Sequence, residues 1–227
     1  MSMSIILPTY NERENLHILV KKILKILPKA ELIIVDDNSF DGTGKLADEL
    51  AKIYPIKVIH RKKRLGLSTA IVAGFKAAKG SIIGVMDTDL SHPPEMIPKL
   101  IKPIIKNKAD FVIGSRIVKG GFVEVWPFHR KFISKIATLM ARPLTSVKDP
   151  MSGLFFLKRK VINNINFTSK GYKICLEIIV KGKYRNIIEV PYKFRTRKVG
   201  TSKLNYKEHF KYLIDWARLI RYRINRK

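Results

Sequence analysis

The stretch SIIGVMDTDLSHPPEM, residues 81–96, contains the transition that decides the fold. A short apolar run rich in isoleucine is typical of a buried strand, and this run ends at two aspartates, Asp87 and Asp89. Two prolines then begin a segment, residues 93–105, that has the start signal and apolar spacing of a helix. A strand that passes through polar residues into a helix is the repeating unit of a parallel sheet covered by helices.

The first 115 residues repeat this unit. The apolar runs predict strands over residues 4–8, 31–36, 56–61, 81–87 and 110–115, and the segments between them predict helices over 11–27, 41–54, 68–79 and 93–105. Further along we expect a helix over 129–144, a strand over 152–159, a helix over 172–182, a strand over 186–195, a loop over 196–205 and a last helix. Pro191 favours an edge position for the last of these strands. We therefore predict one α/β domain with a mainly parallel central sheet flanked by helices.

The charge of the chain is strongly positive and unevenly distributed. The sequence has 45 Lys and Arg against 18 Asp and Glu, a formal net charge of +27. Residues 1–100 hold 15 basic and 11 acidic side chains, whereas residues 101–227 hold 30 and 7. The excess positive charge of the second half either faces a negatively charged partner or is widely solvated, and nucleic acid, an anionic bilayer surface and a phosphorylated substrate are the candidate partners.

The remaining bulk features predict a cytoplasmic protein. The single cysteine, Cys175, excludes an internal disulfide, and we expect it to be a small buried hydrophobic residue. The N-terminal residues predict a first strand and not a signal peptide. No apolar run reaches the roughly 18 residues that a membrane span needs.

Polar residues gather where the predicted strands end. The stretches PTYNERE (8–14), DDNSFDGT (36–43), DTDLSH (87–92) and GSR (114–116) each follow an apolar run. Ordinary turns and helix caps would explain any one of them. Ligands of parallel α/β sheets bind at this carboxyl-terminal edge, so the four stretches together indicate a binding site. The stretch RLGLSTAIVAG (64–74) matches neither the dinucleotide fingerprint nor the P-loop.

The two aspartates have two interpretations. If the strand continued through Asp87 and Asp89, both carboxylates would face the same side and would repel each other unless a proton or a cation lay between them. Mg²⁺ or Mn²⁺ would satisfy such a pair and would also accept phosphate oxygens. Alternatively, one aspartate caps the following turn while the other is solvated.

Several motifs in one order carry a family resemblance. They are LPTYNE, VDDNSFDGT, GLSTA, MDTDLSHPPE, GSR, KDPMSG and RKVGTSKL, and they span about residues 4–205. This series resembles the polyprenol-phosphate sugar transferases, above all the dolichol-phosphate mannose synthases, within glycosyltransferase family 2. The resemblance implies the GT-A fold, a Rossmann-like α/β domain.

The resemblance also implies a donor site. A nucleotide-sugar donor would be bound at its base and ribose by a group of residues around the first two strand ends, namely Pro8, Tyr10, Glu12 and Asp37. Asp87 and Asp89 would hold Mg²⁺ or Mn²⁺ on the diphosphate, with Asp87 also binding the nucleotide. Relatives commonly have a glutamine as a further metal ligand where this chain has Ser91, a departure that would weaken the metal shell, insert a water or change the preferred ion.

On the acceptor side the resemblance implies a lipid phosphate, which is largely dianionic near neutral pH and needs no general base. Arg116, Arg130 and Ser134 match the acceptor-phosphate positions of the family. Arg197, Ser202 and Lys203 match a loop that closes over the reactants. The catalytic set would be Asp89, Arg116, Arg130 and Arg197, with a Lewis-acid metal and inversion at the sugar. Solvated surface charge is the alternative for Arg116 and Lys203.

Two further residues have open roles. His92 either contacts a phosphate or simply lies at the start of a helix, and Glu177 either lines the acceptor region or balances nearby positive charge.

The donor and the partners also stay open at this level. GDP-mannose is the favoured donor and UDP-glucose or another UDP-sugar is the alternative. A basic nucleic-acid-binding module is the hypothesis from another class, although no nucleic-acid motif is present.

We expect peripheral attachment to a membrane surface through residues 119–144 and the last helix, with or without a membrane subunit. Residues 1–205 would form the transferase domain, and 206–227 would be part of it or a docking extension; the last helix could equally pack its apolar face on the sheet.

Overall fold

The computed structural model describes residues 1–169, 171, 173–197 and 206–225. Its described part contains a seven-stranded sheet in the order β3-β2-β1-β4-β7-β5-β8. The strands are β1 (Met3–Thr9), β2 (Glu31–Asp36), β3 (Ile56–His60), β4 (Ile82–Val85), β5 (Phe111–Ser115), β7 (Phe155–Lys158) and β8 (Ile187–Pro191). Only β7 runs antiparallel to its two neighbours in this sheet. The predicted mainly parallel sheet is confirmed, and Pro191 ends an edge strand as expected.

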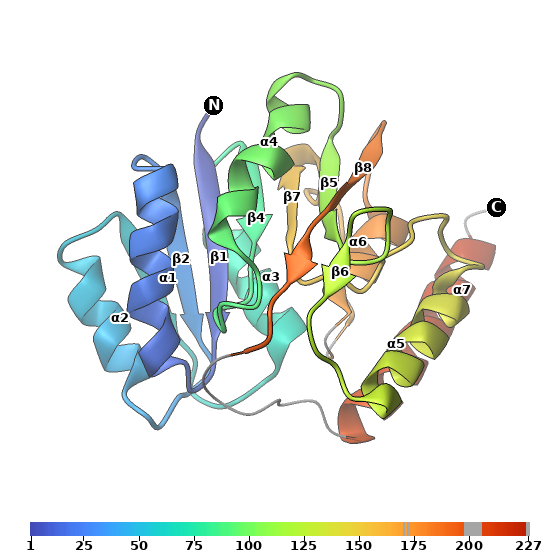
Figure 1. Ribbon diagram of the computed structural model, residues 1–227, viewed down its shortest axis with the longest axis horizontal. Coiled ribbons are helices and arrows are strands. Elements are labelled where there is room, and N and C mark those ends of the chain that lie inside the picture. The colour runs from blue at the N-terminus through green and yellow to red at the C-terminus, as the bar shows by residue number, and fades with distance from the viewer. Residues whose placement is uncertain (170, 172, 198–205, 226–227) are drawn as a thin grey trace.

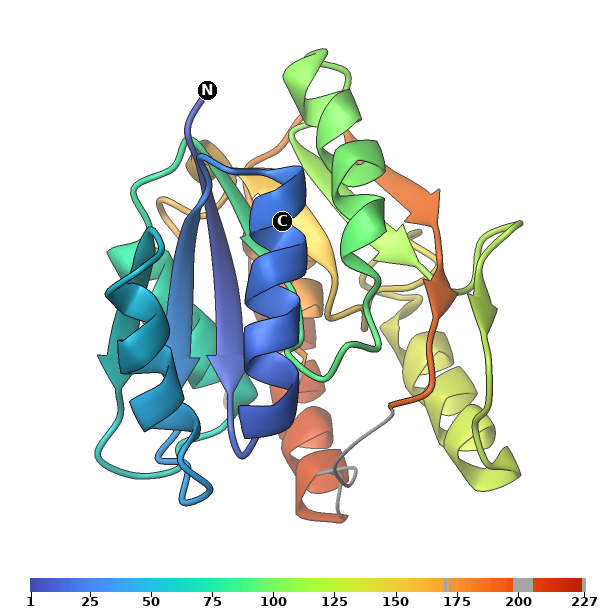
Figure 2. The same cartoon turned by 60° about the vertical axis from the view of Figure 1, so that its left-hand side comes forward.

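Helices cover both faces of the sheet (Figure 1). On one face lie α1 (Arg13–Ile26), α2 (Thr43–Ala51) and α4 (Ile97–Ile105), the last preceded by a 3₁₀ turn, η1 (Pro94–Met96). On the other lie α3 (Leu67–Ala77) and α6 (Ile174–Lys181), and a second 3₁₀ turn, η2 (Arg159–Val161), follows β7. Figure 2 shows α1 and α4 in front of the sheet.

Both faces of the central strands are buried, which explains their nearly continuous apolar sequence. In β2, Leu32 and Ile34 pack in the cluster under α1 and α2, whereas Ile33 and Val35 pack in the cluster under α3 and α6. A strand that is apolar on both sides cannot tolerate carboxylates inside the sheet. Asp37, Asp87 and Asp89 accordingly lie just beyond the ends of β2 and β4.

The structure corrects the predicted end of β4. The strand pairs with β7 only through Ile82 to Val85, so Asp87 and Asp89 lie in the following loop and not in an extended strand. The backbone N–H of Asp87 is donated to Nδ1 of His92, which takes the place of a strand partner. Leu90 has a positive φ of 61° and turns the chain between the aspartates and His92. Strand alternation is therefore not what brings the two carboxylates together.

The predicted strand over 186–195 is also wrong as one element. It breaks at the buried Tyr192 into β8 and β9 (Lys193–Phe194), and β9 pairs in parallel with β6 (Phe122–Val123) in a separate two-stranded sheet. The backbone of Tyr192 bridges the two sheets, because its N–H donates to Ser115 and its carbonyl accepts from Phe122. This small sheet brings the chain after β9 back toward the loop that follows β4.

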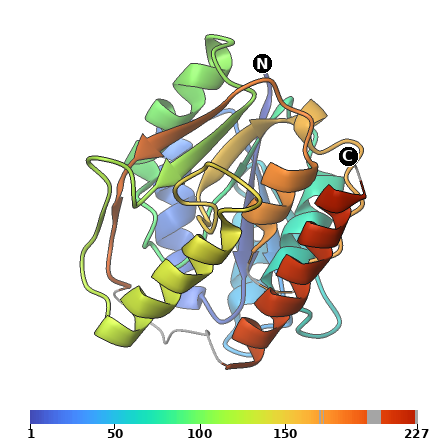
Figure 3. The same ribbon diagram turned by 90° about the vertical axis from the view of Figure 1, so that its right-hand side faces the viewer.

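A pair of helices lies side by side beyond the sheet (Figure 3). They are α5 (Phe128–Ala141) and α7 (Tyr206–Ile224), joined by hydrogen bonds from the Tyr212 hydroxyl to the Ala137 carbonyl (2.7 Å) and from the Trp216 ring to the Met140 carbonyl (2.6 Å). Tyr212 and Leu219 are buried with residues of α5 and α6. The described side chains of the last helix thus pack on α5 and α6, and none of them belongs to the two clusters that pack on the sheet. Its predicted apolar face is divided, since Phe210 and Ile224 stay about two-thirds exposed.

Candidate active site

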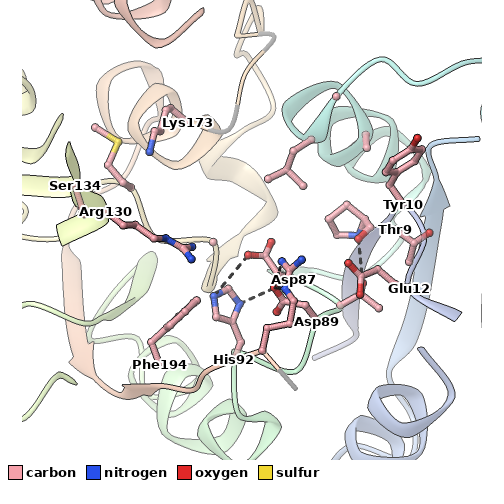
Figure 4. Close-up of a pocket in the computed structure, with 18 of the residues that line it drawn as sticks. Thr9, Tyr10, Glu12, Asp87, Asp89, His92, Arg130, Ser134, Lys173 and Phe194 are labelled. Atoms are coloured by element: carbon pink, nitrogen blue, oxygen red, sulfur yellow. Dashed lines mark hydrogen bonds and ion pairs between the residues drawn. The ribbon is translucent and has the colours of Figure 1, made fainter. Parts of the chain in front are cut away.

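A cleft of about 470 Å³ opens at the carboxyl-terminal edge of β1, β2 and β4 and extends to α5, α6 and α7. It collects every predicted site residue of the described chain except Ser91, namely Pro8, Tyr10, Glu12, Asp37, Asp87, Asp89, Arg116, Arg130, Ser134 and Arg197. Ser202 and Lys203 lie outside the described residues. In Figure 4, Asp87 and Asp89 lie between Tyr10 and Glu12 on one side and Arg130 and Lys173 on the other.

His92 holds the loop that carries the two aspartates. Its ring is buried against Tyr192 and Phe194. Because Nδ1 accepts the Asp87 N–H at 3.2 Å, the ring proton lies on Nε2, which is 3.7 Å from Asp87 Oδ2. Burial lowers the pKa of His92 to about 4, so the ring is neutral near pH 7. His92 therefore orients Asp87 and offers no positive charge to a phosphate.

A glycine lets the backbone approach Asp87 closely. A Cβ atom on Gly153 would lie 2.7 Å from Asp87 Oδ2 and 3.0 Å from the His92 ring. Any larger residue would push the carboxylate out of place. The KDPMSG motif therefore contributes its glycine directly to the geometry of the acidic pair.

The two carboxylates have different pKa values because their neighbours differ. Burial and the negative charge of Asp89 raise the pKa of Asp87 to about 7. Burial also opposes ionisation of Asp89, but the positive charge of Arg197 and hydrogen bonds from Ser91 outweigh it and lower that pKa. Arg197 Nε donates to Asp89 Oδ2 at 3.0 Å, and the backbone N–H of Ser91 donates to Oδ1 at 3.0 Å. Asp89 is thus ionised and paired with an arginine.

This acidic pair fits a divalent cation that shares its shell with a ligand. Among the described residues, no three His, Cys, Asp or Glu side chains are grouped as a complete metal site. Mg²⁺ and Mn²⁺ commonly bind through one or two carboxylates and take their other oxygens from phosphates and water. Asp87 and Asp89 supply carboxylates of that kind. The raised pKa of Asp87 is the expected property of a partly buried carboxylate with a negative neighbour.

Aromatic and cationic side chains form the end of the cleft beside β1, on the other side of the acidic pair from Arg130 and Lys173. The guanidinium of Arg64 lies 4.2 Å from the centroid of the Tyr10 ring. Phe40 meets the same ring edge-on at 6.3 Å and is 82% exposed. This arrangement offers flat surfaces on which a planar ring can stack.

Asp37 fixes the loop that carries Arg64. Its carboxylate accepts the backbone N–H groups of Leu65 (2.9 Å) and Gly66 (2.8 Å) and pairs with Arg61 at 2.8 Å. Gly66 has a φ of 97°, a left-handed conformation that favours glycine at this turn. The prediction that Asp37 holds a nucleotide stays a prediction, and its visible contacts are with this loop.

Pro8 and Glu12 line the same end of the cleft as Tyr10 and Arg64. The carbonyl of Pro8 accepts the Thr88 hydroxyl at 3.0 Å, which ties β1 to the aspartate loop. Glu12 is buried and its Oε2 accepts the side-chain amide of Asn15 at 2.8 Å.

Arg116 is held by a buried ion pair. Its Nε and Nη2 atoms donate to the two oxygens of Asp149 at 2.8 and 2.7 Å, and its backbone N–H donates to Oδ2 at 2.9 Å. Asp149 is fully buried and the Arg116 side chain is 11% exposed. The guanidinium also lies 5.4 Å from the centroid of the Trp126 ring. Arg116 is therefore not a solvated surface charge, and much of its charge is already neutralised.

Arg130 and Lys173 have a different environment. Arg130 lies over the Trp126 ring at 4.4 Å, and its buried Nε has no hydrogen-bond partner among the described residues. Lys173 Nζ lies 5.7 Å from the centroid of the Tyr212 ring. Neither side chain pairs with a carboxylate in the part of the chain that the structure describes. These two cations face the cleft without a negative partner there.

Sequence analysis missed several residues that shape the cleft. Asp149 and Gly153 belong to the KDPMSG motif, which by itself indicates only the family resemblance. Lys173 was one lysine among many in a basic half, so no pattern distinguished it. Glu177 does not line the cleft: it accepts the backbone N–H of Thr168 and pairs with Lys181, which bears out the charge-balancing alternative.

Comparison with known proteins gives the family. The model of glycosyl transferase family 2 matches residues 4–165, and the chain belongs to that family. It is 49% identical to a dolichol-phosphate mannosyltransferase of Pyrococcus furiosus over 98% of this chain, and it spans 64% of that protein. It is 40% identical to the dolichol-phosphate mannosyltransferase of Saccharomyces cerevisiae, covering 92% of this chain and 84% of that one. A polyprenol monophosphomannose synthase of Mycolicibacterium smegmatis is 38% identical, covering 98% and 88%.

Solved structures support the fold. A glucosyl-3-phosphoglycerate synthase of Mycobacterium tuberculosis, crystallised with Mn²⁺, UDP and phosphoglyceric acid, matches 98% of this chain and 78% of that chain. The TM-score is 0.70 at 20% sequence identity. The predicted GT-A fold is confirmed by this likeness.

The buried Arg116–Asp149 pair predicts a stability effect. Asp149→Asn leaves a buried guanidinium without its carboxylate, so we expect the free energy of unfolding to fall by about 3–5 kcal/mol. Urea denaturation measures the loss. The control is Asp48→Asn, which breaks the half-exposed pair with His60 and should cost under about 1 kcal/mol. Equal losses in the two variants would show that the Arg116–Asp149 pair does not stabilise the fold.

Proposed function

We propose that this chain is a metal-dependent inverting glycosyltransferase that moves mannose from GDP-mannose to a dolichyl or polyprenyl phosphate. The observation that carries the proposal is a single cleft with an acidic pair between an aromatic end and a cationic end. The names of the relatives, which cover most of this chain, support the lipid-phosphate acceptor and the mannosyl group.

The aromatic end suits the donor nucleotide. Tyr10, with Arg64 over its ring, would hold the base, and Pro8, Glu12 and Asp37 would frame the ribose. Asp87 and Asp89 would hold a Mg²⁺ or Mn²⁺ ion, which as a Lewis acid would stabilise negative charge on the departing nucleoside diphosphate. Ser91 hydrogen-bonds Asp89 and so would act through that carboxylate. His92 and Gly153 keep Asp87 aimed at the same point.

The cationic end suits the acceptor phosphate. A phosphate monoester has a second pKa of about 6, so it is mostly dianionic at neutral pH and needs no base. One of its oxygens would form a bond to the anomeric carbon while the bond from that carbon to the diphosphate breaks, and the electron pair would leave with the nucleoside diphosphate. Displacement in line inverts the anomeric centre, so an α-linked donor gives a β-linked product. Arg116, Arg130 and Ser134 would hold the phosphate against repulsion from the donor.

Arg197 links the two ends. In the structure it pairs with Asp89 at the position where a metal ion would need that carboxylate. We infer that this pair opens when the donor binds, which frees the guanidinium to contact phosphate oxygens. Arginine suits the exchange, since its planar fork pairs equally well with a carboxylate or a phosphate.

Membrane attachment is the remaining part of the proposal. The structure contains no helix, within its described residues, that is long and apolar enough to cross a bilayer. Large apolar side chains nevertheless point outward from α5, where Phe128, Phe132, Ile136 and Leu139 are 83%, 56%, 42% and 69% exposed. On the neighbouring α7, Phe210 and Leu213 are also exposed. These exposed side chains would dock peripherally at the cytoplasmic side of a membrane, with the cleft close to the lipid phosphate.

The central test of the activity is a donor screen with a short polyprenyl phosphate and Mg²⁺ or Mn²⁺. We expect mannolipid and GDP from GDP-mannose, and a much lower rate with UDP-glucose. Asp89→Asn should lower kcat/KM at least about 100-fold because it removes a metal-binding charge, whereas Asp48→Asn should leave it unchanged. Transfer from UDP-glucose and not from GDP-mannose would show that the donor is UDP-glucose. The nucleic-acid alternative would be favoured if the wild-type protein transferred no sugar but bound RNA, and if the Asp89→Asn variant bound RNA equally well or more tightly.

The apolar face predicts vesicle binding. The double variant Phe128→Glu/Phe132→Glu should reduce the affinity for phosphatidylserine-containing vesicles by about tenfold or more, since each buried phenylalanine contributes on the order of 1.5–3 kcal/mol. Flotation at low salt measures the bound fraction. Ile53→Glu is the matched control, because Ile53 is 74% exposed outside α5 and α7. Equal flotation of the double variant and the wild type would contradict the docking face.

A further inference from the structure

Lys173 enters the cleft from the residue that precedes α6. It lies among lining residues from three other elements, with Arg130 and Ser134 on α5, Tyr212 on α7 and Met151 before β7. Figure 4 shows its side chain and that of Arg130 on the same side of the acidic pair. Lys173 therefore lines the same cleft as Arg130 and Ser134, and the family motifs quoted for this chain do not include it.

The charges of the cleft divide into paired and unpaired groups. Arg116 pairs with Asp149 at 2.7 Å, and Arg197 pairs with Asp89. Within the described chain, no carboxylate pairs with Arg130 or Lys173. Placing two cations in a partly buried cleft is unfavourable unless an anion joins them. The unpaired charge therefore marks where an anion binds.

We propose that Lys173 binds the acceptor phosphate together with Arg130 and Ser134, and that it makes the site selective for a phosphate monoester. The inference rests on the proposed function, which it deepens by naming a residue. The planar fork of Arg130 can contact two phosphate oxygens, while the compact ammonium of Lys173 contacts a third as a point charge. Two positive groups match a dianion, so a diester with a single negative charge binds less well.

The electrostatics of Lys173 supply a distinctive pH signature. Burial and the positive charges of Arg116 and Arg130 lower its pKa to about 8, against the opposing effect of Asp149. Tyr212 faces it as a neutral ring. In the free protein the Lys173 side chain is therefore charged below pH 8, and it loses its proton and its charge as the pH rises through that value. A bound phosphate favours the charged form, so acceptor affinity should fall above pH 8.

The test compares Lys173→Met, Lys173→Arg and the control Lys183→Met, which removes an exposed lysine just beyond α6. Geranyl phosphate is titrated by calorimetry at pH 7 into the full chain. We expect its Kd to rise about tenfold or more in Lys173→Met, with GDP affinity unchanged, and to stay close to wild type in Lys173→Arg and Lys183→Met. The arginine variant should also lose the decline above pH 8. The preference for geranyl phosphate over its methyl diester should shrink in Lys173→Met. Unchanged monoester affinity and selectivity in a folded Lys173→Met protein would overturn the proposal.

A second measurement uses the wild type and needs neither variant nor activity. Lys173 is labelled with acetic anhydride between pH 6 and 10, and the modified peptide is quantified by mass spectrometry. Geranyl phosphate should protect Lys173 at least several-fold and should leave Lys183 unprotected. Absence of protection at saturating geranyl phosphate would overturn the assignment. If no sugar is transferred but protection is seen, the proposed function fails while the phosphate site stands.

Discussion

Two carboxylates in one short loop, Asp89 buried and Asp87 partly exposed, repel each other, and the cleft is organised around that repulsion. Asp87 and Asp89 lie just beyond β4, where His92 and Gly153 fix the first and Arg197 neutralises the second. The repulsion, together with burial, raises the pKa of Asp87 to about 7. Such an arrangement stabilises the folded chain less than an apolar loop would, which is typical of a site kept for a ligand.

The positive charges of the cleft also depend on their neighbours, and they differ in whether a carboxylate pairs with them. Asp149 holds Arg116 in place through three hydrogen bonds, two from the guanidinium and one from the backbone N–H, so Arg116 is a fixed part of the cleft wall. Arg130 and Lys173 stay without carboxylate partners among the described residues. Arg197 lies between these groups, paired with an aspartate that a cation would also need. We infer that donor and acceptor binding are coupled through this arginine, since the same guanidinium cannot hold Asp89 and a phosphate at full strength.

The sequence predicted the layers and the location of the cleft because both depend on patterns that a single chain displays. Apolar runs of strand length with polar residues at their ends were enough to predict that Tyr10, Asp87 and Arg116 lie at one edge of the sheet. The errors arose where distant segments decide the outcome: β4 ends at Val85 because β7 stops pairing there, and the 186–195 strand breaks at Tyr192 because β6 draws Lys193 and Phe194 into a second sheet. Asp149 and Lys173 could not be assigned roles, because their partners Arg116 and Tyr212 lie over thirty residues away in sequence.

The most direct measurement of the account is the location of Mn²⁺ by anomalous scattering in crystals grown with Mn²⁺ and GDP. We predict a single strong peak bridging the GDP diphosphate and the carboxylates of Asp87 and Asp89, with Arg197 no longer paired with Asp89. An ion bound elsewhere, or Arg197 still on Asp89 beside bound nucleotide, would contradict the account.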